Sequence, residues 1–275
     1  MDIRGSKVFI TGAASGIGRA TAFAMAKLGA RLFLADINQK GLEETYQTIS
    51  KNNGEVCKYK AIDISIYKDV KAFADEIHQI FGPIDILINV AGIALFAQIE
   101  DMNHKQWEKV IGVNLWGPVH GIECFVPEMI RAKRGHVVSV SSTAGIIGLP
   151  WHTVYAATKH ALVGISEVLR YDLKKHSIDV SVICPGAVAT DMVDSAEIVG
   201  AKDAVEKAKV RFLKVALPPE RVAELIIGAI QKKRFLVITS PDIKILFFLK
   251  RHVFPLYHLI MRFICRYMDK ELLKK

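Results

Sequence analysis

The chain has 275 residues, and 51% of them are apolar, which suffices for a large core and excludes a disordered protein. Its 37 Lys and Arg against 28 Asp and Glu give a formal charge of +9, which points to an anionic partner such as nucleic acid, a membrane surface or a charged cofactor. Residues 241–275 hold eight of the cations and three of the acids, a net charge of +5. The basic character therefore belongs largely to the C-terminal end.

The four cysteines and nine histidines show none of the spacings that bind metals or build disulfide frameworks. We therefore predict no metal and a reducing, cytoplasmic environment. The N-terminal residues fit neither a signal peptide nor a myristoylation site. Near the C-terminus the longest stretch without Lys, Arg, Asp or Glu covers 252–261, about half of the ~20 apolar residues that a membrane span needs.

Apolar runs alternate with helical patterns along most of the chain. Seven short runs predict strands over 8–11, 31–35, 56–62, 84–89, 136–141, 179–184 and 235–239. Helical spacing predicts helices over 17–28, 43–50, 70–81, 104–131 (with breaks near Gly112 and Gly117), 155–175 and 220–232. Strands that are apolar on both faces and alternate with helices indicate a parallel sheet with right-handed crossovers.

Two segments lie outside this alternation. Residues 191–218 form a long polar and helical insertion after the sixth strand, and such insertions in a compact domain are usually lids or binding segments. Residues 241–275 contain six aromatic residues, and Pro255 is expected to divide them into two helices. We therefore expect one domain over 1–240, a substrate-binding lid at 191–218 and a basic amphipathic extension at 241–275.

Glycines follow the first predicted strand and open a helix, in the run Thr11-Gly12-Ala13-Ala14-Ser15-Gly16-Ile17-Gly18. Glycine permits a tight turn and the close approach of backbone to a pyrophosphate, and a helix N-terminus presents unpaired N–H groups to phosphates. The spacing differs from the common GxGxxG pattern, and a purely structural turn is the alternative. The position in the first strand–helix unit favours a dinucleotide site.

Asp36 ends the second predicted strand, 18 residues after Gly18. An acidic side chain there can accept hydrogen bonds from the adenosine ribose hydroxyls, and it repels the 2′-phosphate of NADP. Ile37 and Asn38 supply no cation to reverse that preference, whereas Arg19 follows the glycines and could reach a phosphate. We therefore predict NAD in preference to NADP, with a helix N-cap as the alternative role of Asp36.

Three tyrosine–lysine pairs have the i, i+4 spacing that places both side chains on one helix face: Tyr67/Lys71, Tyr155/Lys159 and Tyr171/Lys175. An ammonium beside a phenol lowers the pKa of the phenol, and such a tyrosine can act as acid or base near neutral pH. Only Tyr155 has a serine 13 residues upstream at the end of a strand, Ser142, where sites in open α/β sheets lie. We predict that this pair is catalytic and that the other two lie on the surface.

Taken in order, these motifs resemble the short-chain dehydrogenase/reductase family over about residues 5–240. The residues that carry the resemblance are Thr11–Gly18, Asp36, Asp63, Asn89-Val90-Ala91-Gly92, Asn114, Ser142, Tyr155-x-x-x-Lys159, and Pro185-Gly186 with Thr190. The resemblance implies a single Rossmann-like α/β domain, doubly wound around a seven-stranded parallel sheet with helices on both faces. It also implies NAD(P)-dependent interconversion of alcohols and carbonyls. Val90 stands where the family often has a second Asn.

The resemblance further implies a role for each matching residue. Tyr155 exchanges the proton at the carbonyl oxygen, Lys159 tunes Tyr155 and binds the nicotinamide ribose, and Ser142 orients and polarises the carbonyl. Asn114 holds a water that links Lys159 to solvent, with a buried structural amide as the alternative. The implied cofactor contacts are Gly12, Ser15, Gly16, Ile17, Gly18, Asp36, Asp63 (adenine amino group, or only a turn residue), Ile64, Asn89 (adenosine side), Ala91, Gly92, Tyr155, Lys159, Pro185, Gly186, Val188 and Thr190 (nicotinamide carboxamide).

The insertion and the extension together could roof an apolar pocket, so we predict a lipophilic substrate: a steroid, a fatty or acyl-chain ketone, or a long-chain secondary alcohol. His152 lies three residues before Tyr155 and is a candidate to line that pocket, with a loop histidine without a role as the alternative. One alternative function is a β-ketoacyl reductase on carrier-bound chains, against which Asp36 weighs because those enzymes usually take NADPH. Another is an inactive Rossmann scaffold that binds a membrane or protein, against which the complete catalytic set weighs.

The extension carries a basic stripe, Arg251, His258, Arg262 and Arg266, beside a broad apolar face. A helix of this type can rest in a membrane interface, and we expect peripheral membrane contact through 241–275 as one outcome. The alternative is that the apolar face packs on the domain or on a partner subunit. Nucleic acid is not expected, because no nucleic-acid-binding motif accompanies the stripe. The family resemblance implies a homodimer or homotetramer.

Overall fold

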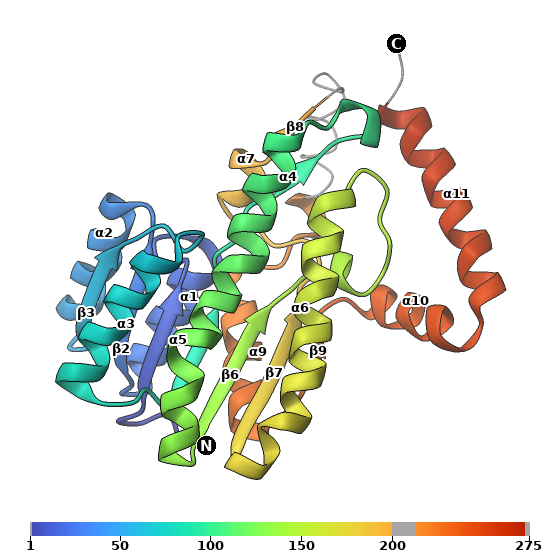
Figure 1. Ribbon diagram of the computed structural model, residues 1–275. Helices are drawn as coiled ribbons and strands as arrows, with labels where there is room; N and C mark the ends of the chain where they lie inside the picture. The colour runs from blue at the N-terminus through green and yellow to red at the C-terminus, as the bar shows by residue number, and fades with distance from the viewer. Residues whose placement is uncertain (1, 200–212, 273–275) are drawn as a thin grey trace.

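Seven parallel strands form the central sheet of the computed structural model, which describes residues 2–199 and 213–272 (Figure 1). In spatial order they are β3 (Glu55–Ala61), β2 (Arg31–Asp36), β1 (Lys7–Thr11), β4 (Ile86–Asn89), β6 (Gly135–Val140), β7 (Ile178–Cys184) and β9 (Leu236–Ile238). Every pairing in this sheet is parallel. The seven strands and the parallel sheet predicted from the sequence are therefore confirmed.

Alternate residues of the strands enter two separate cores, one on each face of the sheet. In β1, Val8 and Ile10 pack into one core and Phe9 packs into the other. The same alternation places Leu32 and Phe33 of β2 on opposite faces. All of these side chains are buried, which is why the strands are apolar at successive positions.

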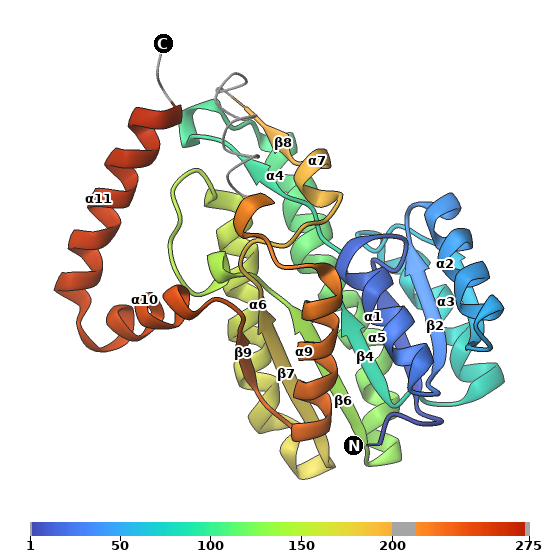
Figure 2. The same cartoon turned by 180° about the vertical axis from the view of Figure 1, so that it is seen from behind.

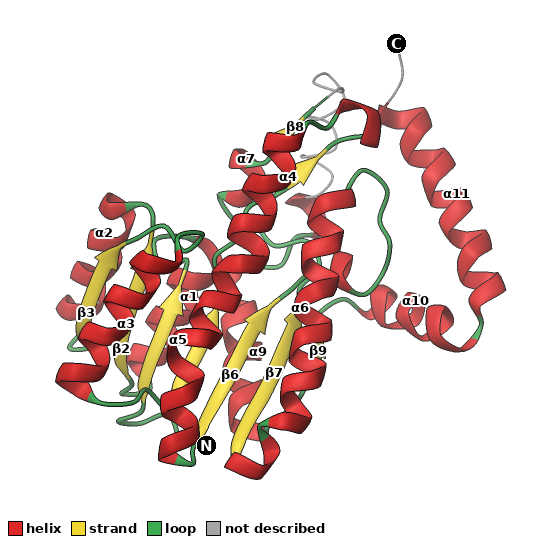
Figure 3. Ribbon diagram, in the orientation of Figure 1, coloured by secondary structure: helices red, strands yellow, loops and turns green. Residues whose placement is uncertain are grey.

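Helices cover both faces of the sheet (Figures 2 and 3). One core is completed by α1 (Gly16–Lys27), α2 (Gln39–Lys51) and α9 (Pro219–Lys232). The other is completed by α3 (Tyr67–Phe81), α5 (Gly117–Ala132) and α6 (Thr153–Asp172). The result is the single doubly wound Rossmann-like domain that the motifs imply. Its strand order changes direction beside β1, and open α/β sheets bind ligands at such a switch point.

The helix predicted over 104–131 does not break at Gly112 and Gly117. Instead α4 (His104–Ile111) continues through a π-helical segment, Gly112–Trp116, directly into α5. Its residues at both junctions keep right-handed helical backbone angles. Such π segments are rare and frequently lie at functional sites; this one contains Asn114.

The insertion after β7 contributes one strand to a second, two-stranded sheet that the sequence did not predict. In the insertion, α7 (Met192–Ser195) precedes β8 (Glu197–Ile198), which pairs in parallel with β5 (Leu95–Phe96), a strand that follows β4. Backbone hydrogen bonds also tie Leu217 to Ala187 and Ala189. Of the lid predicted at 191–218, residues 200–212 lie outside the described residues.

The C-terminal extension forms two helices, α10 (Pro241–His252) and α11 (Phe254–Leu272). Val253 separates them, and Pro255 lies in the first turn of α11, as its fixed backbone angle and missing N–H favour. In both views α10 leads away from β9, and α11 returns along the loop that precedes α6 (Figures 1 and 2). None of the described helices combines the length and apolar character that crossing a membrane requires.

Candidate active site

A cavity of about 1000 Å³ opens beyond the C-terminal ends of the strands. Its wall includes the glycine loop after β1, the ends of β2, β3 and β6, and the start of α6. The other walls come from the segment after β7, from the insertion, and from α10 and α11. Eighteen of the predicted site residues line it: Gly12, Ser15, Gly16, Ile17, Gly18, Asp36, Asp63, Ile64, Ala91, Gly92, Ser142, His152, Tyr155, Lys159, Pro185, Gly186, Val188 and Thr190.

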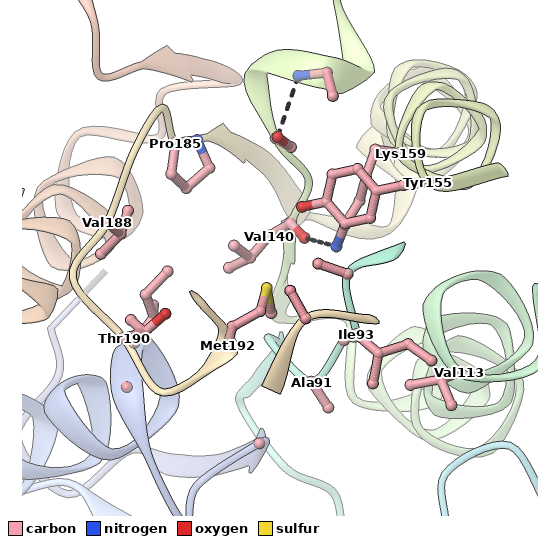
Figure 4. A pocket seen from close by; sticks show the side chains of 18 of the residues that line it. Ala91, Ile93, Val113, Val140, Tyr155, Lys159, Pro185, Val188, Thr190 and Met192 are labelled. Carbon is pink, nitrogen blue, oxygen red and sulfur yellow. Dashed lines mark hydrogen bonds between the residues drawn. The ribbon is translucent and has the colours of Figure 1, made fainter. Parts of the chain in front are cut away.

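Tyr155 and Lys159 face this cavity from one side of α6, and Ser142 faces it from the end of β6. The Lys159 Nζ atom donates to the Val140 carbonyl at 3.0 Å (Figure 4). It also lies 5.7 Å from the centre of the Tyr155 ring. The two other tyrosine–lysine pairs are on the surface, as predicted, since Tyr67 is 41% and Tyr171 66% exposed.

Burial dominates the electrostatics of this pair. It raises the pKa of Tyr155, and the neighbouring Ser142 hydroxyl only partly offsets the rise. It lowers the pKa of Lys159 to about 8. The lowered pKa that we expected for Tyr155 from the i, i+4 spacing is therefore not found. The Lys159 ammonium bonds the Val140 carbonyl instead of the phenol, and burial sets the direction for both groups.

Asn114 lies behind the cavity wall and is fully buried. Its Oδ1 accepts from the Ile93 N–H at 2.8 Å, and its Nδ2 donates to the Ile93 carbonyl at 2.9 Å. Between this amide and the catalytic lysine lies Gly92: a Cβ there would be 3.1 Å from Asn114 Oδ1 and 3.4 Å from Lys159 Nζ. Asn114 thus holds the backbone beside Lys159, and one lone pair of its Oδ1 remains for a water.

The glycine loop owes its shape to positions that exclude a side chain. Gly12 has a φ of +73°, and a Cβ there would lie 2.9 Å from the Ala91 backbone. A Cβ at Gly18 would lie 2.0 Å from the Gly12 carbonyl oxygen. The Thr11 hydroxyl also accepts the N–H groups of Val90 and Ala91, which joins the ends of β1 and β4. The loop is therefore compact, and the N-terminal end of α1 that follows it faces the cavity.

Asp36 supports the glycine loop directly. Its carboxylate accepts the Ala14 N–H and the Asn38 N–H, each at 2.9 Å. The N-cap of α2 is Asn38, so the alternative N-cap role of Asp36 is wrong. Arg19 is turned toward α2, where it donates to the Gly41 carbonyl and pairs with Glu44. Arg19, a cation that could have favoured a phosphate, is thus already engaged by α2.

Asp63 and Ile64 line the cavity just beyond the end of β3. Asp63 Oδ1 accepts both the N–H and the hydroxyl of Ser65. These two hydrogen bonds close an Asx turn. Among the described contacts, Oδ2 of Asp63 accepts no hydrogen bond from the protein. Asp63 is therefore a turn residue that can also bind a ligand. Sequence reasoning missed Ser65, although a hydroxyl two residues after an Asp is a usual companion of such a turn.

Asn89 does not reach the cavity, contrary to the role that the resemblance implied. It ends β4 with its side chain toward α5, where its Nδ2 is 3.5 Å from the Pro118 carbonyl and a Cβ at Gly121 would lie 2.8 Å from its Oδ1. Because side chains alternate along a strand, Val90 faces the cavity in its place.

His152 is held beside Tyr155 by neighbours in the loop. Its Nδ1 lies 2.5 Å from the Pro150 carbonyl, and its ring meets those of Phe96 and Tyr155 edge-on. Burial lowers the pKa of His152. A neutral ring that donates from Nδ1 to a carbonyl leaves Nε2 as an acceptor.

Apolar side chains far apart in the sequence complete the cavity. They are Ile93, Phe96, Val113, Leu149, Trp151, Met192, Ile198, Val215, Ile243 and Met268. Met192 and Val188 are seen at this wall in Figure 4. Among the described residues, no group of His, Cys, Asp and Glu is arranged to hold a metal ion. The glycine loop, the strand-end carboxylates and the residues after β7 fit a dinucleotide, and the apolar wall fits a second molecule beside it.

Comparison with known proteins places this geometry in a family. A model of the short chain dehydrogenase family matches residues 6–198. The chain is 35% identical over 245 residues to "Dehydrogenase/reductase SDR family member 7B" of Bos taurus, covering 87% of this chain and 75% of that one. It is 32% identical over 259 residues to a "CLA biosynthesis dehydrogenase/reductase" of Lactiplantibacillus plantarum, covering 88% and 90%.

A solved structure is similar along nearly the whole chain. It is a short chain dehydrogenase/reductase from Burkholderia phymatum in complex with NAD. The TM-score is 0.85 at 31% identity, and the alignment covers 93% of this chain and 96% of that one. The chain belongs to the short-chain dehydrogenase/reductase family and is an oxidoreductase of that family.

Proposed function

We propose that this protein is an NAD(H)-dependent oxidoreductase that interconverts a secondary alcohol and a ketone on a lipophilic substrate. One observation carries the proposal: a single cavity joins a dinucleotide loop, the set Ser142, Tyr155 and Lys159, and an apolar wall. A nicotinamide cofactor would supply the acceptor or donor of hydride. Gly12–Gly18, Asp36, Asp63 and the residues from Pro185 to Thr190 would hold it.

Side chains of the protein transfer the proton that the substrate oxygen gains or loses. In reduction the Tyr155 hydroxyl donates its proton to the carbonyl oxygen, and in oxidation the Tyr155 phenolate oxygen takes the proton of the alcohol. The Ser142 hydroxyl orients that oxygen and stabilises charge on it. A proton that leaves Tyr155 passes by way of Lys159 and a water on Asn114 Oδ1, for which Gly92 leaves the space.

Asp36 supports NAD over NADP. Its carboxylate is fixed by two backbone N–H groups, so it cannot turn away from a 2′-phosphate without losing them. Arg19 and Glu44 already form an ion pair at 3.4 Å. The same preference weighs against a β-ketoacyl reductase that takes NADPH.

The apolar wall supports a substrate such as a steroid, a fatty ketone or a long-chain secondary alcohol. Leu149, Trp151, Met192, Ile243 and Met268 come from the loop before α6, the insertion and both extension helices. Beside this wall His152 Nε2 offers an acceptor, which suits a substrate with a further hydroxyl. A homodimer or homotetramer, which the family resemblance implies, and a cytoplasmic location, inferred from the cysteine spacing, are part of the same proposal.

The first test is Tyr155→Phe. Without the hydroxyl we expect turnover of long-chain ketones and secondary alcohols to fall at least about a thousandfold, because the group that exchanges the proton is removed. NADH fluorescence should show unchanged cofactor binding. The matched control is Tyr171→Phe, on the exposed face of the same helix, which should be as active as the unaltered protein.

The same measurement separates the competing functions. Equal turnover in Tyr155→Phe and the unaltered protein would rule out the acid–base role. Absence of turnover in the unaltered protein with both NADH and NADPH, together with tight cofactor binding, would favour an inactive scaffold. Faster turnover of carrier-bound β-ketoacyl chains with NADPH would favour the reductase alternative.

A further inference from the structure

Helix α11 presents three distinct faces. Tyr257, Met261, Ile264 and Met268 recur at spacings of 4, 3 and 4 residues and face the body of the protein. Tyr257 and Met261 are buried against Ile147, and the Tyr257 hydroxyl accepts the Gly148 N–H at 3.2 Å. This inner face attaches the helix to the body of the protein.

A second side of α11 is also apolar, and its side chains are exposed. Leu256, Leu259, Phe263 and Tyr267 recur at spacings of 3, 4 and 4 residues and are turned away from Tyr257 and Met261. Phe263 is 73% exposed and Leu259 64% exposed. On α10, Ile245 and Phe248 are exposed to a similar degree. A continuous patch of large apolar side chains on a protein surface marks an interaction site. We call Leu256, Leu259, Phe263 and Tyr267 the outer face.

Basic side chains run along one side of the outer face. Of the stripe identified in the sequence, His258, Arg262 and Arg266 lie on α11, and Lys270 extends it by one more step of four residues; all four are exposed. Basic side chains beside an apolar strip match lipid phosphates beside their acyl chains.

We propose that the outer face and the basic stripe dock on an anionic lipid bilayer. The apolar side chains would enter the boundary between headgroups and acyl chains, and the arginines would bind lipid phosphates. Charge decides between this partner and a second copy of the chain: residues 241–275 carry a net charge of +5. Two copies meeting through this face would bring two basic stripes together.

Docking would also bring the cavity close to lipophilic molecules in the bilayer. Met268 of α11 and Ile243 of α10 line the cavity, so the docked helices would form the wall between the site and the bilayer. This part rests on the proposed lipophilic substrate, whereas the docking itself does not.

Vesicle co-sedimentation of the full-length protein tests the docking. Vesicles of phosphatidylcholine with about one third phosphatidylglycerol should retain the protein at low salt, and pure phosphatidylcholine vesicles should not. Arg262→Glu/Arg266→Glu should weaken binding about a hundredfold or more, and Leu259→Ser/Phe263→Ser should weaken it at least about tenfold. The matched control is Lys174→Glu/Lys175→Glu, which makes the same charge change at an exposed site after α6 and should bind as the unaltered protein does.

Four results would overturn the docking: equal binding to both kinds of vesicle, binding to neither, loss of binding in the lysine control, or full binding by both α11 variants. Concentration-dependent dimerisation abolished by Leu259→Ser/Phe263→Ser would assign the face to a second copy, and tight binding of a labelled oligonucleotide would assign the stripe to nucleic acid.

None of the substituted side chains lines the cavity, so turnover of a small soluble ketone should persist in all three variants. If the unaltered protein also fails to turn over this ketone, that result would count against the proposed activity and leave the docking result intact.

Discussion

Lys159 is a cation enclosed by protein, 3% exposed, and its ammonium donates a hydrogen bond to the Val140 carbonyl. Burial lowers its pKa from 10.5 to about 8, which corresponds to a cost on the order of 3 kcal/mol for holding the charged form in the folded state. Strongly shifted pKa values cluster at functional sites, which supports the role proposed for Lys159.

We predict that Lys159→Met abolishes turnover and stabilises the fold at pH 7. The folded protein binds this proton less tightly than the unfolded chain, so the penalty is complete below pH 8 and disappears as the pH rises toward 10.5. In urea unfolding at pH 7, the unfolding free energy of the variant should exceed that of the original by roughly 1–3 kcal/mol, and the difference should shrink at pH 10. The lower value applies because the substitution leaves the Val140 carbonyl unpaired. A variant less stable than the original at pH 7 would contradict the prediction.

Asp36 acts through a charge that two backbone N–H groups hold in place. We predict that Asp36→Asn lowers the ratio of kcat/KM for NADH to that for NADPH by about tenfold or more, because the repulsion of the 2′-phosphate is lost. Asp63→Asn is the matched control, since it changes the same group at the neighbouring strand end. It should weaken both cofactors alike, and an altered ratio in that variant would show that Asp36 alone does not set the preference.

At the scale of elements, the turn from β1 into α1 depends on an approach that only glycine allows. A Cβ at Gly18 would lie 2.0 Å from the Gly12 carbonyl oxygen, which is a backbone atom and cannot rotate away as a flexible side chain could. We predict that Gly18→Ala weakens NADH binding at least about tenfold and lowers the unfolding free energy by more than about 1 kcal/mol. NADH fluorescence titration and urea unfolding measure the two effects.

Gly164 in α6 provides the contrasting case. It is exposed, and a Cβ there meets nothing within 4 Å. Gly164→Ala should therefore raise the unfolding free energy by about 0.5–1 kcal/mol through helix propensity and leave NADH binding unchanged. If both alanine variants behaved alike, the steric account of the glycine loop would be wrong.

At the scale of the whole molecule, the extension is attached to the catalytic domain through the loop that also carries the cavity wall. Tyr257 packs on Ile147, and the Lys250 ammonium donates to the Ile146 carbonyl at 2.8 Å. Leu149 and Trp151 of the same loop line the cavity. The position of α11 and the shape of the substrate wall are therefore coupled.

We predict that Tyr257→Ala raises the KM for a long-chain ketone several-fold, because the loop loses its packing against α11. The KM of a small ketone and the affinity for NADH should stay as they are, since the glycine loop is on the other side of the domain (Figure 1). Steady-state kinetics with the two ketones measures the difference. Tyr171→Ala, which removes an exposed ring, should change neither value; a uniform rise for both ketones in Tyr257→Ala would indicate general loss of structure.

The strands, the glycine loop, Asp36 and the Ser142, Tyr155 and Lys159 set could be predicted because each has a local signature. Apolar strands flanked by helices belong to a parallel sheet, and their C-terminal ends must meet at one edge. Short sequence patterns near strand ends are therefore enough to identify distant residues that meet at one cavity. The bare tyrosine–lysine spacing was ambiguous, and the serine at a strand end resolved it.

Other features depended on the packing of distant segments. Two-residue strands such as β5 and β8 have no periodicity to detect, so their pairing exists only through the fold. Whether Asn89 or Val90 faces the cavity depends on where β4 ends against α5, and the pKa of Tyr155 depends on burial that many elements share.

The sequence by itself determined the class of fold, the dinucleotide end of the site and the concentration of positive charge in residues 241–275. Only the tertiary structure decided which apolar side of α11 stays exposed beside that charge, because two sides of α11 are apolar in the sequence and only packing shows which is covered. Tyr257 and Met261 are buried against the body, which leaves Leu259 and Phe263 exposed beside the basic stripe. Periodicity reveals that a helix has an apolar face, whereas solvent exposure reveals which face still lacks a partner.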